Sequence, residues 1–293
     1  SGKLDAAQLE ALSKALTAAG DSAGAGLAMQ LAAAEGKVVA TSLAEDAPPR
    51  SVEEAYLKLH LISHRWVKPH ETDLTGLFGL LPNVAWTDQG PVDLEELPQR
   101  QLEARLKGSV LEVSSVDKFP KMTNYAVPAG VRIAHTARVR LGAYLGEGTT
   151  VMHEGFINFN AGTEGPGMIE GRISAGVWVG EGSDLGGGCS TMGTLSGGGD
   201  IVISVGKGCL IGANAGLGIP LGDRCTIEAG LFVTAGTKIS VLDEGGDIIE
   251  TVSARTLAGR PDLLFRRHSS TGTVQCLTNK SAIELNEMLH ANN

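Results

Sequence analysis

Aliphatic residues recur every six positions between Ile133 and Ile239, and a glycine often follows directly. A period of six matches neither an α-helix, which repeats every 3.6 residues, nor an amphipathic strand, which repeats every two. It is typical of a hexapeptide solenoid, in which short parallel strands wind around a prism and stack one aliphatic side chain per face inward. The glycines allow tight corners, where a side chain would clash or φ must be positive. The repeat positions are Ile133, Val139, Leu145, Val151, Ile157, Ile173, Val179, Leu185, Thr191, Val205, Ile211, Leu217, Leu221, Ile227, Val233 and Ile239.

The six-residue register is interrupted three times, by steps of 16, 14 and 4 positions that are not multiples of six. We expect each interruption to be a bulge or an extruded loop, because rigid scaffolds commonly carry their functional residues on loops. The first interruption contains residues 158–172 and the second contains residues 192–200. The interruptions separate Ile157 from Ile173, Thr191 from Val205, and Leu217 from Leu221.

Mixed helix and strand patterns flank the solenoid on both sides. Before it, apolar residues at helical spacing cover 4–19, and Ser51 with Glu54 forms a capping box that opens a helix through Ile62. A further helix is predicted at 94–107, with strands at 36–42 and 109–115. After the solenoid we expect short strands with a turn at 269–272, then a final helix at 281–290 opened by Ser281 and Glu284.

The predicted fold class is therefore mainly β, a parallel β-helix of hexapeptide repeats with additions at both ends. We expect an N-terminal α/β domain at 1–122, the β-helix at 123–242, and a small C-terminal α+β segment at 243–293. Of the 40 glycines, 25 lie between residues 145 and 240, so the glycine enrichment belongs to the solenoid and not to a disordered linker.

Charge and cysteine content narrow the possible partners and location. The net charge of −9 argues against binding to nucleic acid or to an anionic membrane surface. Four cysteines without CxxC spacing are typical of buried thiols in a reducing cytosol. No apolar run approaches the ~20 residues of a membrane span, and no signal-peptide pattern is present. We expect a soluble, cytoplasmic protein.

Two long segments carry a specific resemblance to a known family. VMHEGFINFNAGTEGPGMIEGRISAGVWVGEGSDLGGG and GANAGLGIPLGDRCTIEAGLFVTAGTKI resemble the tetrahydrodipicolinate N-succinyltransferases, in their actinobacterial form. The likeness runs from about residue 118 to the end and includes LLFRRHS and ELNEMLHAN. The family implies a left-handed β-helix, a homotrimer with active sites between subunits, and succinyl transfer from succinyl-CoA to the amino group of ring-opened tetrahydrodipicolinate, in lysine and diaminopimelate synthesis.

The resemblance implies that Glu170, within the first interruption, is the active-site glutamate. An ammonium must lose a proton before it attacks a thioester, and a well-placed carboxylate base contributes about 10²–10⁴-fold to the rate. The same glutamate could instead form an acyl-anhydride, and the sequence does not distinguish the two routes. Arg172 suits bidentate capture of a substrate carboxylate. The remaining residues that the family implies for donor binding are Gly187, Ser190, Ala213, Glu228, Ala229, Gly236, Arg266, Arg267, His268 and Ser269.

A metal site and three alternative functions remain open. Glu154 matches a family position that holds a metal ion, Mg²⁺, on the trimer axis, although Ala137 occupies the second carboxylate position. If His153 were the base, the chain would be another hexapeptide N- or O-acetyltransferase that uses acetyl-CoA. A zinc hydratase needs about three converging histidines, and the solenoid offers only His135 and His153. A non-catalytic scaffold would leave the interruptions without a purpose.

Overall fold

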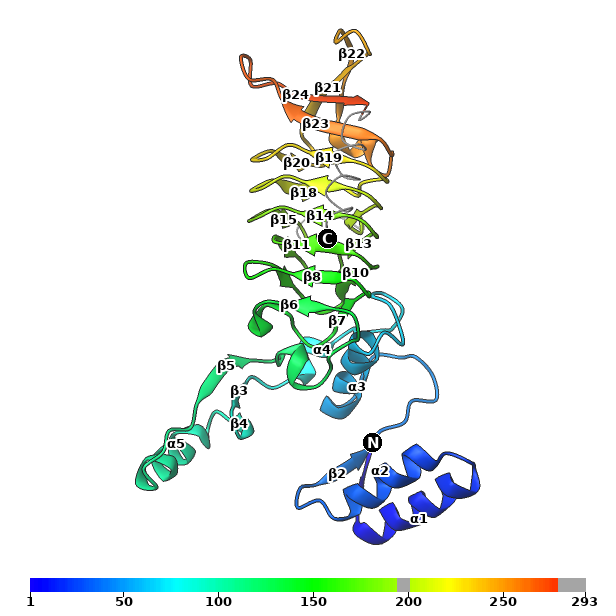
Figure 1. Cartoon of the computed structure of the whole chain (residues 1–293), viewed down its shortest axis with the longest axis vertical. Helices are drawn as coiled ribbons and strands as arrows, with labels where there is room; N and C mark the ends of the chain where they lie inside the picture. Colours follow the sequence, from blue (N-terminus) through cyan, green and yellow to red (C-terminus); the bar gives the residue numbers. More distant parts are fainter. Residues whose placement is uncertain (194–200, 279–293) are drawn as a thin grey trace. The chain divides into compact units, whose positions relative to one another are not determined.

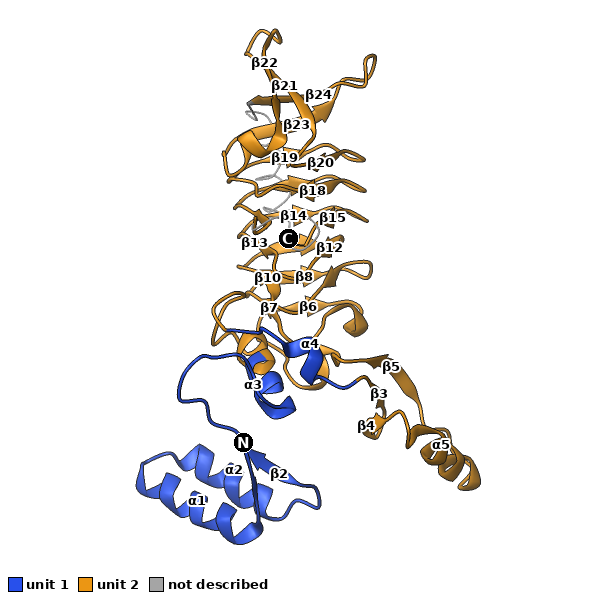
Figure 2. Ribbon diagram, turned by 180° about the vertical axis from the view of Figure 1, so that it is seen from behind, with its two compact units in different colours: residues 1–58, 73–82 blue, residues 59–72, 83–293 orange. Residues whose placement is uncertain are grey.

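The computed structural model describes residues 1–193 and 201–278 of the chain. It contains two compact units, formed by residues 1–58 with 73–82 and by residues 59–72 with 83–293 (Figures 1 and 2). These two units neither confirm nor contradict the expected domain limits at 122 and 242, which stay predictions. Among the described residues, no helix combines the length and hydrophobicity that crossing a membrane requires.

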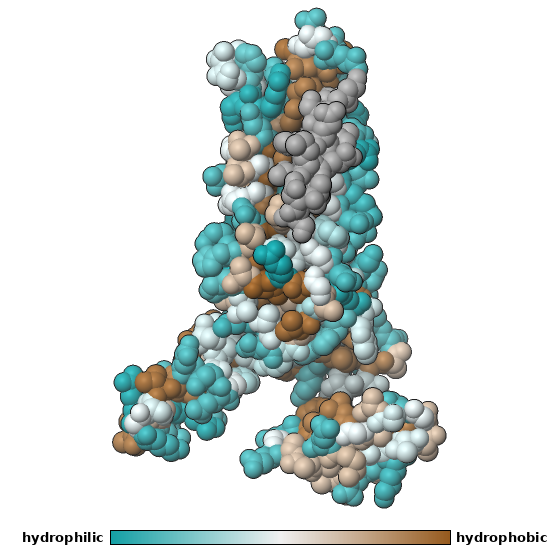
Figure 3. Space-filling model, in the orientation of Figure 1, coloured by the Kyte–Doolittle hydropathy of each residue, from teal (hydrophilic) through white to brown (hydrophobic). Residues whose placement is uncertain are grey.

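The first unit is built around a pair of helices and a two-stranded antiparallel sheet. Its elements are α1 (Ala6–Ala18), α2 (Ser22–Ala32), α4 (Leu77–Leu80), β1 (Gly2–Leu4) and β2 (Val38–Ala40). Asp5 caps α1 by accepting the Gln8 N–H at 2.8 Å, and the Gln8 side chain accepts the Asp5 N–H at 3.0 Å. The predictions found α1 and β2 but missed α2, whose alanines and glycines carry little hydrophobic periodicity. Hydrophobic patches are visible over these helices in Figure 3. The large exposed hydrophobic residues of α1 and α2 are Leu12, Leu27 and Met29.

The second unit begins with part of α3 (Val52–Ser63) and a small antiparallel sheet. This sheet has the order β4–β3–β5, with β3 (Val84–Thr87), β4 (Gly90–Asp93) and β5 (Val113–Asp117). The predicted helix near 94–107 is confirmed as α5 (Leu97–Leu106), whereas the strand expected at 109–115 lies at β5. An ion pair between Arg140 and Asp117 (2.7 Å) connects this sheet to the solenoid.

The solenoid has three parallel sheets that form the faces of a prism, as the six-residue period predicted. Face I contains β7 (Ala143–Leu145), β10 (Ala161–Thr163), β13 (Trp178–Val179) and β16 (Ser204–Val205). Face II contains β6 (Arg132–Ile133), β8 (Thr149–Val151), β11 (Gly167–Ile169), β14 (Asp184–Leu185), β17 (Leu210–Ile211) and β19 (Thr226–Ile227). Face III contains β9 (Phe156–Ile157), β12 (Arg172–Ile173), β15 (Ser190–Thr191), β18 (Gly216–Gly218) and β20 (Phe232–Thr234). Every strand of these faces except β6, whose Ile133 is only partly buried, buries one inward side chain in a single continuous core.

The first register interruption is not an extruded loop, and this expectation was wrong. Thr163 and Ile169 both occupy inward, buried positions, so the chain keeps its six-residue step through β10 and β11. Only the step from Ile169 to Ile173 is short, because the corner between β11 and β12 contains two residues fewer. The polar Thr163 is tolerated in the core because its hydroxyl pairs with that of Thr149 at 2.8 Å.

The other two interruptions differ from each other. The third is also a shortened corner, since the Leu221 N–H donates to the Ser204 carbonyl (2.9 Å) and keeps its place in the face I stack. The second inserts eight residues beyond the regular step from Thr191 to Val205. Its residues 194–200 lie outside the described part of the chain.

Strands beyond residue 237 continue the solenoid at its C-terminal end. They are β21 (Lys238–Leu242), β22 (Ile248–Ser253), β23 (Leu263–Arg267) and β24 (Val274–Thr278). Because β23 pairs in parallel with β19, it extends face II by one step, and Phe265 fills the inward position above Ile227. The turn expected at 269–272 is confirmed between β23 and β24, where the Gly272 N–H donates to the His268 carbonyl at 2.8 Å. The helix predicted at 281–290 lies outside the described residues.

Candidate functional site

Most of the predicted site residues lie on one edge of the prism, the II–III edge, where the chain passes from face II to face III. Each successive coil contributes its corner residues to this edge, although they are widely separated in sequence. From the lower to the upper coil these corner residues are Glu170, Gly187, Ala213, and Glu228 with Ala229. Backbone hydrogen bonds join the corners, from Gly188 N–H to the Glu170 carbonyl (3.2 Å), from Asn214 N–H to Gly187 (2.9 Å), and from Gly230 N–H to Ala213 (2.8 Å).

Glu170 occupies the two-residue corner between β11 and β12. The corner is tight: a Cβ added to Gly171 would lie 2.2 Å from the Cys189 sulfur, so only glycine fits there. The partly buried Glu170 side chain reaches the next coil, where a Cβ on Gly187 would lie 3.4 Å from its Oε2. Within the described residues, the Glu170 carboxylate makes no hydrogen bond or ion pair, so it is available to accept a proton from a ligand.

Arg172 and Ser190 are neighbours on the outer surface of face III, where β12 and β15 pair in register. The Arg172 guanidinium donates to the Ser190 hydroxyl from Nε (3.2 Å) and from Nη2 (2.8 Å). Its remaining N–H groups lie at an exposed position two residues from Glu170. A carboxylate without a partner in the described chain and a cation with spare donors therefore lie two residues apart in sequence, at the corner and at the start of the next strand.

Arg266 and Arg267 reach the same edge through β23. The backbone N–H of Arg267 donates to the Glu228 carboxylate at 2.6 Å, so the arginine pair lies one step above Glu228. Arg266 Nε donates to the Gln275 side chain at 3.1 Å, and both arginines remain exposed. His268 and Ser269 follow in the turn, where the His268 ring nitrogen pairs with the Thr271 hydroxyl at 3.0 Å.

Gly236 is the predicted site residue that the structure does not bring to the II–III edge. It follows β20 at the opposite border of face III, two positions after Thr234. A Cβ on Gly236 would meet no atom within 4 Å. Its predicted contact with the donor has no support in the geometry of a single chain.

Glu154 lies on the same edge, below Glu170, but its carboxylate already has two partners. Oε2 accepts from the Arg138 guanidinium at 3.1 Å, and Oε1 pairs with His153 Nδ1 at 2.7 Å. The hydrogen bond from His153 and then the charge of Arg138 lower the pKa of Glu154. Within the described chain, no group of three His, Cys, Asp or Glu side chains is arranged to hold a metal ion.

A cavity of about 620 Å³ opens on the outer surface of face II and was not predicted. Arg132, Thr150 and Met168 line it, together with Met152 and several glycines. These are the outward residues of three consecutive strands, and their alternation with the inward aliphatics could have indicated them in the sequence. None of the predicted site residues lines this cavity.

Two of the four buried thiols, those of Cys189 and Cys276, are poor candidates for nucleophiles. Burial raises the pKa of Cys189 and of Cys276 to about 12, so both remain protonated at neutral pH. Cys209 and Cys225 lie on the I–II edge, away from Glu170, and their thiols donate to backbone carbonyls. The side-chain hydrogen bond with Cys225, assisted by burial, raises the pKa of Cys209.

Comparison with known proteins gives consistent matches along the chain. Three family models match: tetrahydrodipicolinate N-succinyltransferase N-terminal at 9–79, tetrahydrodipicolinate N-succinyltransferase middle at 81–121, and hexapeptide repeat of succinyl-transferase at 202–235. The chain is similar to the 2,3,4,5-tetrahydropyridine-2,6-dicarboxylate N-succinyltransferase of Pseudomonas aeruginosa, with 73% identity over 93% of this chain and 79% of that protein. The Vibrio cholerae enzyme of the same name is 63% identical over 99% of this chain and 84% of that protein.

A solved structure gives the same result for the fold. The crystal structure of a Campylobacter jejuni protein described as a 2,3,4,5-tetrahydropyridine-2-carboxylate N-succinyltransferase superposes with a TM-score of 0.86 at 36% identity, covering 96% of this chain and 78% of that one. Together with the hexapeptide match, this confirms the left-handed β-helix. The narrower expectation of an actinobacterial form is not supported, because the similar relatives come from Pseudomonas and Vibrio.

Proposed function

The chain belongs to the tetrahydrodipicolinate N-succinyltransferase family, and from this membership we infer that it transfers a succinyl group from succinyl-CoA to the amino group of tetrahydrodipicolinate. It is an acyltransferase of diaminopimelate and lysine biosynthesis. The observation that carries this conclusion is 73% identity over 93% of the chain to the Pseudomonas aeruginosa enzyme. The II–III edge adds a chemical reason, since along it lie a carboxylate without a partner among the described residues, an exposed arginine on the adjoining strand, and a pair of arginines.

We propose that Glu170 acts as the general base. The acceptor amine is an ammonium ion at neutral pH, and Glu170 first takes one proton from it, so that the neutral amine can attack the thioester carbon. The tetrahedral oxyanion then collapses and expels the coenzyme A thiolate, which takes up the second proton that the nitrogen loses as the amide forms. The free carboxylate supports this role, as does its fixed position in a two-residue corner. An acyl-anhydride on Glu170 would use the same carboxylate, and the assay below separates the two routes.

We assign Arg172 and Ser190 to a substrate carboxylate, on succinate or on the acceptor. Arg172 retains free guanidinium donors, and a guanidinium matches a carboxylate in two parallel hydrogen bonds. At the other end of the edge, Arg266 and Arg267 suit the phosphates of coenzyme A. Four steps of about 4.8 Å separate these two ends, a span of about 19 Å. An extended pantetheine arm fits this distance and would run past Gly187, Ala213, Glu228 and Ala229.

We propose that the enzyme is a cytoplasmic homotrimer with small-molecule substrates, as the family resemblance implies. The magnesium ion expected on its axis does not fit the residues present. Ala137 offers no ligand, and both Glu154 oxygens are engaged by Arg138 and His153. No step of the reaction is therefore assigned to a metal. The pairing of His153 Nδ1 with Glu154 leaves Nε2 available, so the choice between His153 and Glu170 as the base is left to the donor assay below.

A thiol-release assay with purified enzyme tests the function. We expect release from succinyl-CoA only when the cyclic dicarboxylate acceptor is present, and little release from acetyl-CoA. Equal rates with both donors would favour the acetyltransferase alternative, and no release from either would contradict the assignment. A rapid burst of one thiol per subunit without acceptor would indicate the acyl-anhydride route.

A further inference from the structure

Phe232 is an exposed aromatic residue that the preceding assignments do not use. It lies on the outer surface of face III, in line with Arg172 and Ser190. The strand register gives the line directly, since Arg172 pairs with Ser190, Ser190 with Gly216, and Gly216 with Phe232. The Phe232 side chain is 57% exposed, although a phenyl ring gains free energy when it is buried.

The ring of Phe232 covers Gly216 on the neighbouring strand. A Cβ added to Gly216 would lie 2.0 Å from Cδ1 and 2.2 Å from Cε1 of the ring. Glycine therefore lets the ring lie directly against the strand, with one side packed and the other open. The ring thus occupies the place that a side chain at Gly216 would fill, next to Ser190 on the preceding strand.

The position of Phe232 along the edge indicates which part of the donor it meets. It lies three steps above Arg172, about 14 Å away, and belongs to the same coil as Glu228. The Glu228 carboxylate holds the backbone of Arg267, so the phosphate-binding arginines lie one step higher. In coenzyme A, the group next to the phosphates on the arm is the pantoyl unit, with its two methyl groups.

We propose that Phe232, seated on Gly216, forms an apolar platform for the pantoyl dimethyl group of the acyl donor. This inference rests on the proposed function and extends it to a donor-positioning residue. The pantoyl methyls are the most apolar part of the arm, and the open side of the ring is the exposed apolar surface at that height. Covering about 50 Å² of apolar surface improves binding roughly 5- to 10-fold.

The test compares two donors in Phe232→Ala and Phe232→Leu. Succinyl-CoA carries the pantoyl unit, whereas S-succinyl-N-acetylcysteamine lacks both it and the phosphates. We expect Phe232→Ala to raise the KM for succinyl-CoA about 5- to 10-fold with little change in kcat. It should leave kcat/KM for the truncated donor within about twofold of wild type, and Phe232→Leu should recover part of the loss.

Tyr144→Ala is the matched control, because Tyr144 is an outward aromatic at the same repeat position on face I. This variant should keep the wild-type KM for succinyl-CoA. An equal loss with both donors, or a changed subunit number in light scattering, would give Phe232 a purely structural role and overturn the proposal. An unchanged KM in Phe232→Ala would also overturn it. If wild-type enzyme fails to use succinyl-CoA at all, it is the proposed function that fails.

Discussion

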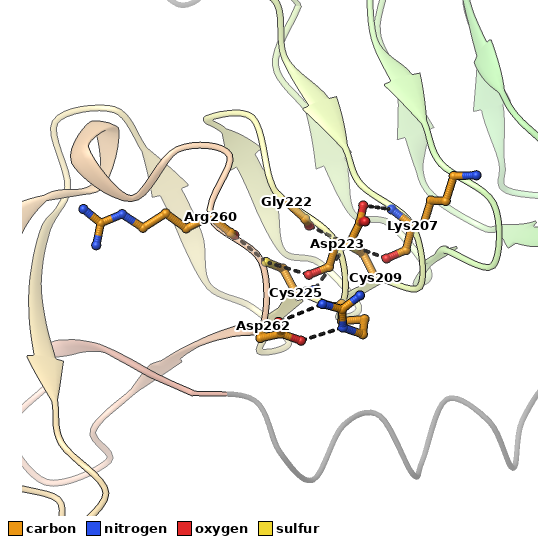
Figure 4. A network of polar contacts seen from close by, with 8 residues as sticks. Lys207, Cys209, Gly222, Asp223, Cys225, Arg260 and Asp262 are labelled. Atoms are coloured by element: carbon orange, nitrogen blue, oxygen red, sulfur yellow. Dashed lines mark hydrogen bonds and ion pairs between the residues drawn. The ribbon is translucent and has the colours of Figure 1, made fainter.

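The two edges that border face II are built from the same repeat but differ in how their charged side chains are paired around Glu170 and Arg172. On the I–II edge, Lys207 lies 3.3 Å from Glu164 and 3.5 Å from Glu181. On the same edge Arg224 binds Asp262 at 2.6 Å, and Figure 4 shows the contacts of Asp262 close to Asp223 and Cys225. On the II–III edge, the Glu170 carboxylate has no such partner within the described residues. Arg172 meets only a neutral hydroxyl there.

The difference between the edges separates scaffold from site. On the I–II edge, hydrogen bonding and charge from Glu164 raise the pKa of Lys207, and the hydrogen bond from Arg224 lowers the pKa of Asp262. These charges are satisfied inside the chain and join consecutive coils. On the II–III edge Glu154 and Glu228 are also paired inside the chain, whereas Glu170 has no partner among the described residues and is left for a ligand. Matched substitutions on the two edges test this division.

The largest effect is expected at Glu170. Glu170→Gln keeps the shape of the side chain but removes its ability to accept a proton, so kcat should fall about 10²–10⁴-fold. Melting temperature should not change, because the carboxylate makes no internal contact in the described chain. Steady-state kinetics and thermal unfolding measure the two effects.

Glu164→Gln is the control on the I–II edge, since Glu164 binds Lys207 and the Glu181 N–H. It should leave kcat within about twofold and lower the melting temperature slightly, as expected for a partly exposed ion pair. Near-normal turnover in Glu170→Gln would show that Glu170 is not the base. A large loss of kcat in Glu164→Gln would contradict the assignment of a purely structural role to the I–II edge.

The second effect concerns Arg172. Arg172→Ala removes a charged hydrogen-bond donor to a carboxylate, so the KM for one acidic substrate should rise about 10- to 100-fold. Lys207→Ala removes a cation from the I–II edge, whose partners are Glu164 and Glu181, and should leave both KM values unchanged. Equal KM values in Arg172→Ala and wild type would place the substrate carboxylate elsewhere.

The contrast between the edges was only partly predictable from sequence. The six-residue period gives each residue a face, so Arg172 and Ser190 could be placed on neighbouring strands. The interruption that contains Glu170 was expected to be a bulge or an extruded loop, because Thr163 breaks the aliphatic pattern although its side chain points inward. A hydroxyl that is hydrogen-bonded to Thr149 substitutes for an aliphatic side chain at that position.

The contacts of residues that follow the repeat could not be predicted, because the sequence has no six-residue period there. Arg267 and Asp262 reach the solenoid only because β23 returns to pair with β19. Arg267 then meets Glu228 on one edge, while Asp262 meets Arg224 on the other. Neither contact can be predicted from sequence spacing, because β21 and β22 lie between the last regular repeat and β23 and do not follow the six-residue period. The resemblance to the family identified the arginine pair, and the structure supplied its neighbours.

The smallest effect, at Asp262, tests the scaffold edge by pH. Arg224 lowers the pKa of Asp262, so this ion pair stabilises the fold above the ordinary carboxyl pKa and is lost as pH falls through the lowered value. Asp262→Asn suits this test, because Asp262 has a φ of 60° and asparagine tolerates that region. At pH 7 the variant should melt about 1–3 °C below wild type, a size typical of an exposed ion pair.

The Asp262→Asn difference should be constant from neutral pH down to about pH 4 and narrow below it, because protonation of Asp262 then removes the ion pair from wild type as well. Thermal unfolding across this range measures the trend, and kcat at pH 7 should equal that of wild type. High salt should narrow the difference at pH 7, since exposed charges are screened. If the difference in melting temperature between wild type and Asp262→Asn widened as the pH falls, Asp262 would stabilise the fold through its uncharged contacts. The coils would then be held together at the I–II edge by backbone pairing and not by this ion pair.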